Sequence, residues 1–198
     1  DSNNNIYVAD TDNHSIRKIT PEGMVSTLAG TGTRGFVNGS VTDAQFERPQ
    51  AVAVDSNNNI YVADTNNYRI RKIDTNGVVS TFAGAGTRGF VNGSGTDAQF
   101  DNPRGVAVDS ANNIYVVDRF NHSIRKITPE GVVSTIAGSG DEGFENGSSS
   151  TAQFNFPIDA AVDSNNNIYV ADTDNHSIRR IDLNSIVVGA ITGDSTAQ

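Results

Sequence analysis

Three histidines, His14, His122 and His176, are the first side chains in this 198-residue sequence whose type suggests chemistry. Three imidazoles are a sufficient protein ligand set for a catalytic zinc ion. All three, however, occupy one position of a repeated sequence, in which Tyr68 takes the fourth place. A shared zinc site would require side chains from different repeats to reach a common axis. We therefore expect a structural role for these residues and predict no metal site.

The aspartates that could bind calcium or act in catalysis also occupy repeated positions of the sequence. The run Asp1-Ser2-Asn3-Asn4-Asn5 begins like a calcium-binding loop, but Ile6 stands where that loop needs a glycine. Asp10, Asn13 and Arg17 have the types needed for acid–base catalysis, yet an equivalent set is found in every repeat. A catalytic site is normally unique in a chain, whereas scaffold residues repeat. We therefore predict a hairpin turn for the first group and a turn with a local ion pair for the second, with no catalytic residue and no cofactor.

The composition narrows the class of protein. The formal net charge is −9 and the Lys and Arg residues are scattered, so the sequence lacks the basic stripe that neutralises nucleic-acid phosphates. No apolar run approaches the roughly 18 residues of a membrane-spanning helix, and we predict neither a nucleic-acid nor a membrane partner. The lack of cysteine is compatible with a reducing cytoplasm or with an exported bacterial protein. Of these two, we favour an exported or cell-surface location.

A 54-residue repeat organises the whole sequence. The string Asp-Ser-Asn-Asn-Asn-Ile-Tyr-Val-Ala-Asp begins at Asp1, Asp55 and Asp163, and a close variant begins at Asp109. About three quarters of the positions are identical between the first two copies, so each copy must be the same structural unit. We expect a single array over residues 1–198, divided into units 1–54, 55–108, 109–162 and a partial unit 163–198.

Each unit contains four short apolar runs separated by turn residues. In one such unit these runs are residues 51–54, 60–63, 70–73 and 78–83. Their lengths predict strands, and the Asp- and Asn-rich links between the first three predict tight turns. Four such strands form an antiparallel meander that is apolar on both faces, so neighbouring units must stack face to face. Radial stacking of four-stranded sheets is a β-propeller. The predicted fold class is therefore an all-β propeller of four-stranded antiparallel blades.

Residues 5–19, with the sequence Asn-Ile-Tyr-Val-Ala-Asp-Thr-Asp-Asn-His-Ser-Ile-Arg-Lys-Ile, resemble the core of a blade in the NHL-repeat β-propeller family. That family usually has Arg before the Ile that opens the third strand, as in Arg69-Ile70, whereas Ser15, Ser123 and Ser177 depart from the pattern. The resemblance covers essentially the whole chain in four copies. It implies a ring that is commonly six-bladed, in proteins that serve as interaction platforms, RNA binders or, more rarely, metal-dependent lyases.

The count of strands indicates an incomplete ring. The sequence holds four sets of second, third and fourth strands, but only three first strands, and it begins at Asp1 without Met. Three explanations compete: a fragment of a longer ring, a homo-oligomer that builds a ring from partial rings, and an engineered test of repeat assembly. Open sheet edges favour association. We therefore expect a homo-oligomer or a part of a larger ring.

A long connecting segment joins the fourth strand of one unit to the first strand of the next, as in residues 30–49. Segments of this length are usually functional or have structure of their own. We predict a capped helical turn at residues 42–46. Phe36, Phe90 and Phe144 recur in this segment, and we expect them to pin it to the neighbouring unit rather than to contact a ligand.

Positions at which the near-identical repeats disagree carry the remaining functional information. They concentrate in the connecting segments and in the links between the second and third strands, which should share one face of a propeller. The differing residues are Gln50, Arg104 and Ile158; Ala51, Gly105 and Asp159; Tyr68; Arg119 and Phe120; and Asp141 with Glu142 in place of Thr87 and Arg88. Exposed aromatic residues beside arginines are favoured in binding sites. The candidate ligand-binding residues are Tyr68, Arg104, Arg119, Phe120 and Asp159, although drift after duplication explains the same pattern.

Three functions remain at this stage. The first is a non-catalytic propeller that binds a protein, peptide or glycan on its loop-rich face. The second is a structural or engineered repeat array without a ligand, which the high internal identity favours. The third is a metal-dependent propeller lyase or hydrolase, for which Asp159 supplies only one carboxylate near the central axis.

Overall fold

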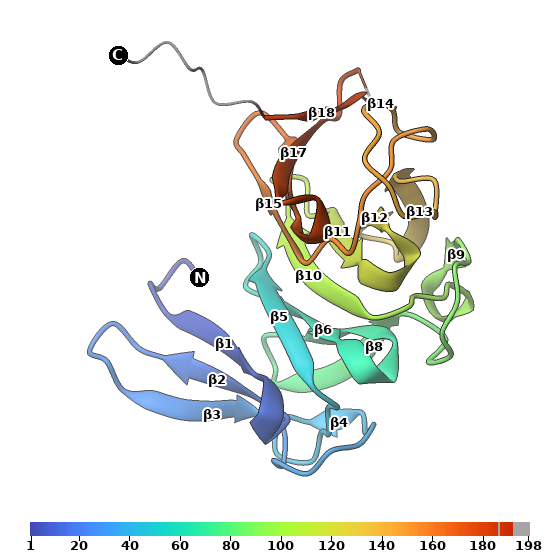
Figure 1. Cartoon of the computed structure of the whole chain (residues 1–198). Helices are drawn as coiled ribbons and strands as arrows, with labels where there is room; N and C mark the ends of the chain where they lie inside the picture. Colours follow the sequence, from blue (N-terminus) through green and yellow to red (C-terminus); the bar gives the residue numbers. More distant parts are fainter. Residues whose placement is uncertain (186, 192–198) are drawn as a thin grey trace.

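The computed structural model describes residues 1–185 and 187–191, and it consists of four antiparallel β-sheets that follow one another along the chain. Figure 1 shows them around an arc, from sheet 1 at the N-terminus (blue) to sheet 4 near the C-terminus (red). The described helices are single 3-10 turns, and none of them is long and apolar enough to cross a membrane. The predicted all-β class is confirmed.

In the part of the chain that the structure describes, sheet 1 has three strands and the other sheets have five each. Sheet 1 comprises β1 (Ile6–Asp10), β2 (Ser15–Ile19) and β3 (Val25–Ala29). Sheet 2 comprises, from one edge to the other, β4 (Gly39–Ser40), β8 (Val78–Ala83), β7 (Arg69–Ile73), β6 (Ile60–Asp64) and β5 (Pro49–Val54). Sheet 3 comprises β9 (Gly93–Ser94), β13 (Val132–Ala137), β12 (Ser123–Ile127), β11 (Ile114–Asp118) and β10 (Pro103–Val108). Sheet 4 comprises β14 (Gly147–Ser148), β18 (Val187–Ala190), β17 (Ser177–Asp182), β16 (Asn167–Asp172) and β15 (Asp159–Val162).

The inner edges of the sheets lie next to one another. Strand β5 contacts both β1 and β10, and β10 contacts β15, so these strands line the inside of the arc in Figure 1. Within the described residues, sheet 1 has no counterpart of β5, β10 or β15. This is the missing first strand that the sequence predicted. The last residues of the sequence, including Ala197 and Gln198, lie outside the described part.

The first hairpin of each unit is held by its leading aspartate. The two Asp55 carboxylate oxygens accept the backbone N–H groups of Asn57 and Asn59, the Asn59 side chain and the Tyr61 hydroxyl at 2.8–3.3 Å. Asn58 supplies the left-handed residue of the turn, at φ +63°. Both carboxylate oxygens are therefore engaged within their own turn, and the hairpin interpretation of this motif is confirmed.

The link between the second and third strands is one 3-10 turn in every sheet. The turns are η1 (Thr11–Asn13), η2 (Thr65–Asn67), η4 (Arg119–Asn121) and η5 (Thr173–Asn175). Each ends on a residue in the left-handed conformation, and these residues are the members of the His/Tyr position: His14, Tyr68, His122 and His176.

The connecting segments add a fifth strand that the prediction of four-stranded blades did not include. Gly39 and Ser40 follow sheet 1 in the sequence, and they pair with Val79 and Val78 at the outer edge of sheet 2. The same pairing recurs for β9 with β13 and for β14 with β18. The predicted helical turn at residues 42–46 is present only as a short turn after this strand, which in the second copy is η3 (Gly95–Asp97).

The hydrophobic core lies between the sheets, and the described residues form three separate clusters there. In the first, Ile16 of sheet 1 belongs to the same buried cluster as Val62 of sheet 2. The corresponding pairs between the later sheets are Ile70 with Val116, and Ile124 with Val170. All six side chains are fully buried. Because every two consecutive sheets bury facing side chains against each other, and sheets 2 and 3 do so on both faces, the face-to-face stacking predicted from the sequence is confirmed.

Candidate ligand-binding face

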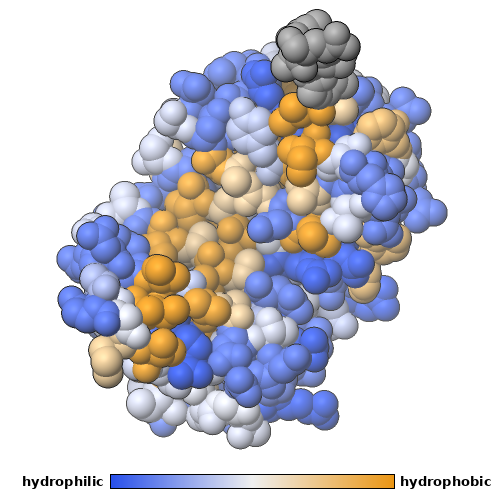
Figure 2. All heavy atoms as spheres, turned by 60° about the vertical axis from the view of Figure 1, so that its left-hand side comes forward, coloured by the Kyte–Doolittle hydropathy of each residue, from blue (hydrophilic) through white to orange (hydrophobic). Residues whose placement is uncertain are grey.

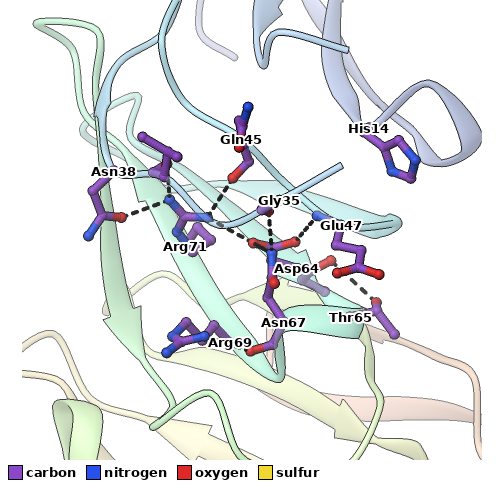
Figure 3. Close-up of polar contacts among 12 residues, drawn as sticks. His14, Gly35, Asn38, Gln45, Glu47, Asp64, Thr65, Asn67, Arg69 and Arg71 are labelled. Atoms are coloured by element: carbon purple, nitrogen blue, oxygen red, sulfur yellow. Dashed lines mark hydrogen bonds and ion pairs between the residues drawn. The ribbon is translucent and has the colours of Figure 1, made fainter. Parts of the chain in front are cut away.

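A buried ion pair ties each connecting segment to the sheet that follows it. Arg71 Nη1 donates to Asp64 Oδ2 at 2.8 Å, and both side chains are fully buried. The guanidinium also donates to the carbonyl oxygens of Val37 and Gln45, while Asp64 accepts the side-chain N–H of Asn67. Figure 3 shows this network bridging β6, β7 and the segment before them. The predicted local ion pair is confirmed.

The same network is built in sheets 3 and 4, by Asp118 with Arg125 and by Asp172 with Arg179, at 2.7 and 2.8 Å. Burial raises the pKa of Asp118 to about 6 against the opposing effect of Arg125, and burial likewise lowers the pKa of Arg125. A charged pair that recurs in three interfaces and faces no solvent belongs to the scaffold.

The histidine position also has a structural role. The backbone N–H of Arg48 donates to His14 Nδ1 at 3.1 Å, and that of Phe156 donates to His122 Nδ1 at 3.3 Å. His14 and His122 thus each hold the end of the connecting segment that leads into the next sheet. These contacts also show that the strand links and the connecting segments share one face, as predicted. Residues 1–185 and 187–191 contain no group of three His, Asp or Glu residues that could hold a metal ion.

The recurrent phenylalanines of the connecting segments stack on arginines of the following sheet. The Phe36 ring centre lies 3.8 Å from Arg69 Cζ and 4.7 Å from Arg71 Cζ. Phe90 and Phe144 stack in the same way on Arg125 and Arg179, respectively, at 5.0 and 4.7 Å. The expected pinning of the segment to its neighbour is confirmed.

Three of the candidate ligand-binding residues gather at the junction of sheets 3 and 4. Arg119 and Phe120 form the start of η4, and Arg104 lies near the beginning of β10. The Arg119 Cζ atom lies 5.0 Å from the Phe120 ring centre and 5.1 Å from that of Phe156. The centre of the Phe156 ring lies 5.8 Å from that of Phe120 and 4.7 Å from that of His122, and both ring pairs are arranged edge to face. We call Arg104, Arg119, Phe120, His122 and Phe156 the arginine–phenylalanine cluster.

The cluster brings two arginines together in an acidic protein. Burial and the neighbouring Arg104 lower the pKa of Arg119, while Asp174 opposes this shift. Burial lowers the pKa of His122 as well, against the opposing effect of Glu142. Among the described residues, neither Arg104 nor Arg119 forms an ion pair, and the buried Nε of Arg119 has no hydrogen-bond partner. Phe120 remains 41% exposed beside them. The cluster therefore presents hydrogen-bond donors and an aromatic ring together.

The other two candidates lie outside this cluster. Tyr68 ends η2 of sheet 2, at the position that His122 takes in sheet 3. Asp159 is exposed at the start of β15, where its Cα would be 2.7 Å from a Cβ added to Gly105. Gly105 is thus required for the close approach of the two inner strands, and Asp159 lies at the inner edge of the array.

The sequence reasoning missed Phe156. It stands where the earlier repeats have Arg48 and Asn102, and all three residues have a positive φ. Phe156 differs from its counterparts in the other repeats, and the same kind of difference identified Arg119 and Phe120. Phe156 lies, however, in the connecting segment, 36 residues from Phe120 in the sequence. Only the folded chain shows that the two rings meet.

Comparison with family models decides the family. The model described as NHL repeat matches residues 1–19, 46–73 and 154–181, and the model described as Teneurin NHL domain matches residues 88–153. The chain belongs to the NHL-repeat family. The resemblance inferred from the sequence is confirmed, and the stacked NHL sheets fit a β-propeller.

The NHL relatives are much longer than this chain. Protein SUPPRESSOR OF QUENCHING 1, chloroplastic, from Arabidopsis thaliana is 30% identical over 195 residues, which cover 92% of this chain and 18% of that protein. NHL repeat-containing protein 2 from Homo sapiens is 31% identical over 187 residues, which cover 86% of this chain and 26% of that protein. The chain thus spans about a quarter or less of the length of these NHL relatives.

Several solved structures share the fold of this chain. A protein of unknown function from Bacteroides thetaiotaomicron VPI-5482 superimposes with a TM-score of 0.73 at 25% identity, over 89% of this chain and 44% of that chain. An auxiliary nutrient binding protein from the same organism superimposes with a TM-score of 0.72 at 21% identity, over 95% of this chain and 46% of that chain. A streptogramin B lyase superimposes with a TM-score of 0.64 at 12% identity, over 100% of this chain and 54% of that chain. The last two likenesses establish the fold alone.

Proposed function

We propose that this NHL protein is a non-catalytic binding module, and that its ligand, a protein, peptide or glycan, contacts the arginine–phenylalanine cluster. One observation carries the proposal. Positions at which near-identical repeats differ, although spread along the sequence, meet at one junction and expose Phe120 beside Arg104 and Arg119. Repeated residues on the same face are engaged in scaffold contacts instead.

The chemistry of the cluster suits recognition rather than catalysis. The guanidinium groups can donate several hydrogen bonds to carboxylate or carbonyl oxygens of a ligand, and burial beside aromatic rings strengthens such bonds. The half-exposed Phe120 ring offers a flat apolar surface to an aliphatic chain or a sugar face. We take sheets 1 to 4 as four consecutive blades, so that this surface lies on the loop-rich face around the propeller axis. The fold shared with an auxiliary nutrient binding protein is consistent with a binding role.

Peptide and glycan arrays probed with the purified chain test the proposal. Arg119→Ala should weaken binding to the selected ligand at least tenfold, a change of about 1.4 kcal/mol. Arg48→Ala is the matched control, because Arg48 is a surface arginine of the same face that pairs with Asp12 at 2.6 Å in another junction. An equal loss of ligand affinity in the two variants would contradict the proposal. Stoichiometric metal in the purified protein would instead favour the lyase or hydrolase alternative.

A further inference from the structure

The junction of sheets 3 and 4, which lies within the described residues, differs from the earlier junctions in a scaffold contact. At the earlier junctions, the threonine that begins the 3-10 turn donates its hydroxyl to a proline carbonyl of the next sheet at 2.7 Å, from Thr11 to Pro49 and from Thr65 to Pro103. Arg119 stands in the place of this threonine, so no hydroxyl is available there. Strand β15 begins only at Asp159, whereas β5 and β10 begin at these prolines.

The aromatic pair of the cluster also replaces a scaffold contact. Phe120 and Phe156 occupy the positions that Asp12 and Arg48 occupy in the first junction. Asp12 and Arg48 form an ion pair at 2.6 Å, and the two phenylalanine rings contact each other edge to face. Both partners of one contact have therefore changed together, although they are far apart in the sequence. We expect such a paired change at a functional site rather than from independent drift.

The arginines of this junction are not engaged by the scaffold. Arg119 lies against both rings, and its buried Nε atom has no hydrogen-bond partner among the described residues. Phe36 is about as exposed as Phe120, at 40%, and it also lies against an arginine. That arginine, Arg69, donates to two backbone carbonyl oxygens at 3.0 and 2.9 Å. A satisfied arginine at one junction thus contrasts with an unsatisfied one at the other.

Exposure of an apolar side chain alone does not mark a site. Figure 2 shows hydrophobic residues at several places on one side of the molecule, and Ile6 and Val25 of sheet 1 are more exposed than Phe120. The arginine–phenylalanine cluster is distinguished by an exposed ring that lies beside guanidinium groups without an ion-pair partner in the described part of the chain.

The hydrogen-bonding groups of the cluster suit a ligand group that only accepts. A guanidinium has N–H donors and no acceptor, and its planar arrangement matches a carboxylate or a phosphate. His122 Nδ1 already accepts the backbone N–H of Phe156. A sugar hydroxyl would therefore bring a proton for which the side chains of the cluster hold no free acceptor. A carboxylate brings none.

Acidic side chains near the cluster favour a ligand group with a single negative charge. Asp174 acts electrostatically on Arg119, and Glu142 and Asp141 act on His122. A phosphorylated side chain carries a charge of about −1.5 to −2 at pH 7, whereas a carboxylate carries one. These three acidic residues therefore repel a phosphate more strongly than a carboxylate.

We infer that the arginine–phenylalanine cluster binds the carboxylate of a glutamate or aspartate in a peptide segment, and that an apolar neighbour in the same peptide packs on Phe120. The guanidinium groups of Arg104 and Arg119 donate to the carboxylate oxygens. This inference rests on the proposed function and specifies the ligand of the same site.

A peptide array in which each glutamate-containing peptide is paired with its glutamine counterpart tests the inference. The wild-type chain should bind the glutamate form at least about tenfold more tightly, because glutamine has nearly the same shape without the charge. Arg104→Gln installs the residue that the first repeat has, Gln50. This variant should reduce the preference for glutamate to about threefold or less, since one of the two guanidinium groups is lost.

A variant that rebuilds the first junction is the matched control for folding. Arg119→Thr, Phe120→Asp and Phe156→Arg together restore the residues of Thr11, Asp12 and Arg48. Urea unfolding of this triple variant should resemble that of the wild-type chain, because the threonine and ion-pair contacts replace the aromatic ones. Its binding to the glutamate peptides should be lost.

The outcomes separate this inference from the proposed function. Peptides that require Arg119 but bind equally in the glutamate and glutamine forms would overturn the carboxylate and leave the proposed function intact. A preference for glutamate that persists in Arg104→Gln and in the triple variant would overturn both. Tighter binding of the phosphoserine forms of the same peptides would overturn the carboxylate in favour of a phosphate. Binding to acidic glycans without binding to any acidic peptide would overturn the peptide, as would the lack of acidic peptides among those bound.

Discussion

At the scale of single residues, the most informative side chain is the arginine of the third strand. Arg71 is fully buried and joins the carboxylate of Asp64 to two carbonyl oxygens of a segment 26 and 34 residues earlier in the sequence. The ion pair could be predicted from the repetition of Asp, Asn and Arg at fixed spacing. The carbonyl contacts could not, because backbone acceptors leave no mark in a sequence and the segment reaches Arg71 only after the sheets stack.

Loss of this arginine should have very different effects in different repeats. Arg71→Met should lower the free energy of unfolding by about 3–5 kcal/mol, because Asp64 would remain buried without its charged partner. Arg17→Met changes the equivalent residue of sheet 1, where the pair with Asp10 is 3.2 Å long and partly exposed. The free energy of unfolding of that variant should fall by about 1 kcal/mol or less. Urea denaturation of both variants measures the difference, and equal losses would mean that the buried network contributes no more than a surface pair.

At the scale of elements, the connecting segment does more than join strands. It supplies the fifth strand of the next sheet, the carbonyl oxygens for the buried arginine, and the ends held by His14 and His122. The four longer strands could be predicted from apolar runs and turn residues. The fifth could not, because Gly39–Ser40 is too short for any periodicity and pairs across to another repeat.

The glycine that begins each connecting segment offers a test at this scale. Gly138 has φ +104°, and an added Cβ would lie 2.5 Å from the carbonyl oxygen of His122. Gly138→Ala should therefore lower the free energy of unfolding by about 2 kcal/mol or more. Gly189 has no atom within 4 Å of an added Cβ, and Gly189→Ala should be neutral or slightly stabilising. Thermal unfolding compares the two, and a neutral Gly138→Ala would show that the turn tolerates a side chain.

At the scale of the whole molecule, repetition separates scaffold from candidate site. The 54-residue period was sufficient to predict the stacking of like units and the missing first strand, because identical sequences must fold alike. It also directed attention to Arg104, Arg119 and Phe120 as departures from the pattern. It could not predict which departures would meet. Tyr68 and Asp159 were grouped with them by the same logic, and the fold places one in sheet 2 and the other at the inner edge of sheet 4.

A pair of phenylalanine variants tests most directly whether the departures form the binding site and the repeated residues form the scaffold. Phe120 and Phe90 are almost equally exposed, at 41% and 42%, but only Phe90 has a counterpart in the other connecting segments. Equilibrium titration of the array-selected ligand should show at least tenfold weaker binding for Phe120→Ala. Phe90→Ala should retain binding and be less stable, because it loses its stacking on Arg125. Full binding by Phe120→Ala, or equal loss in both variants, would contradict this account.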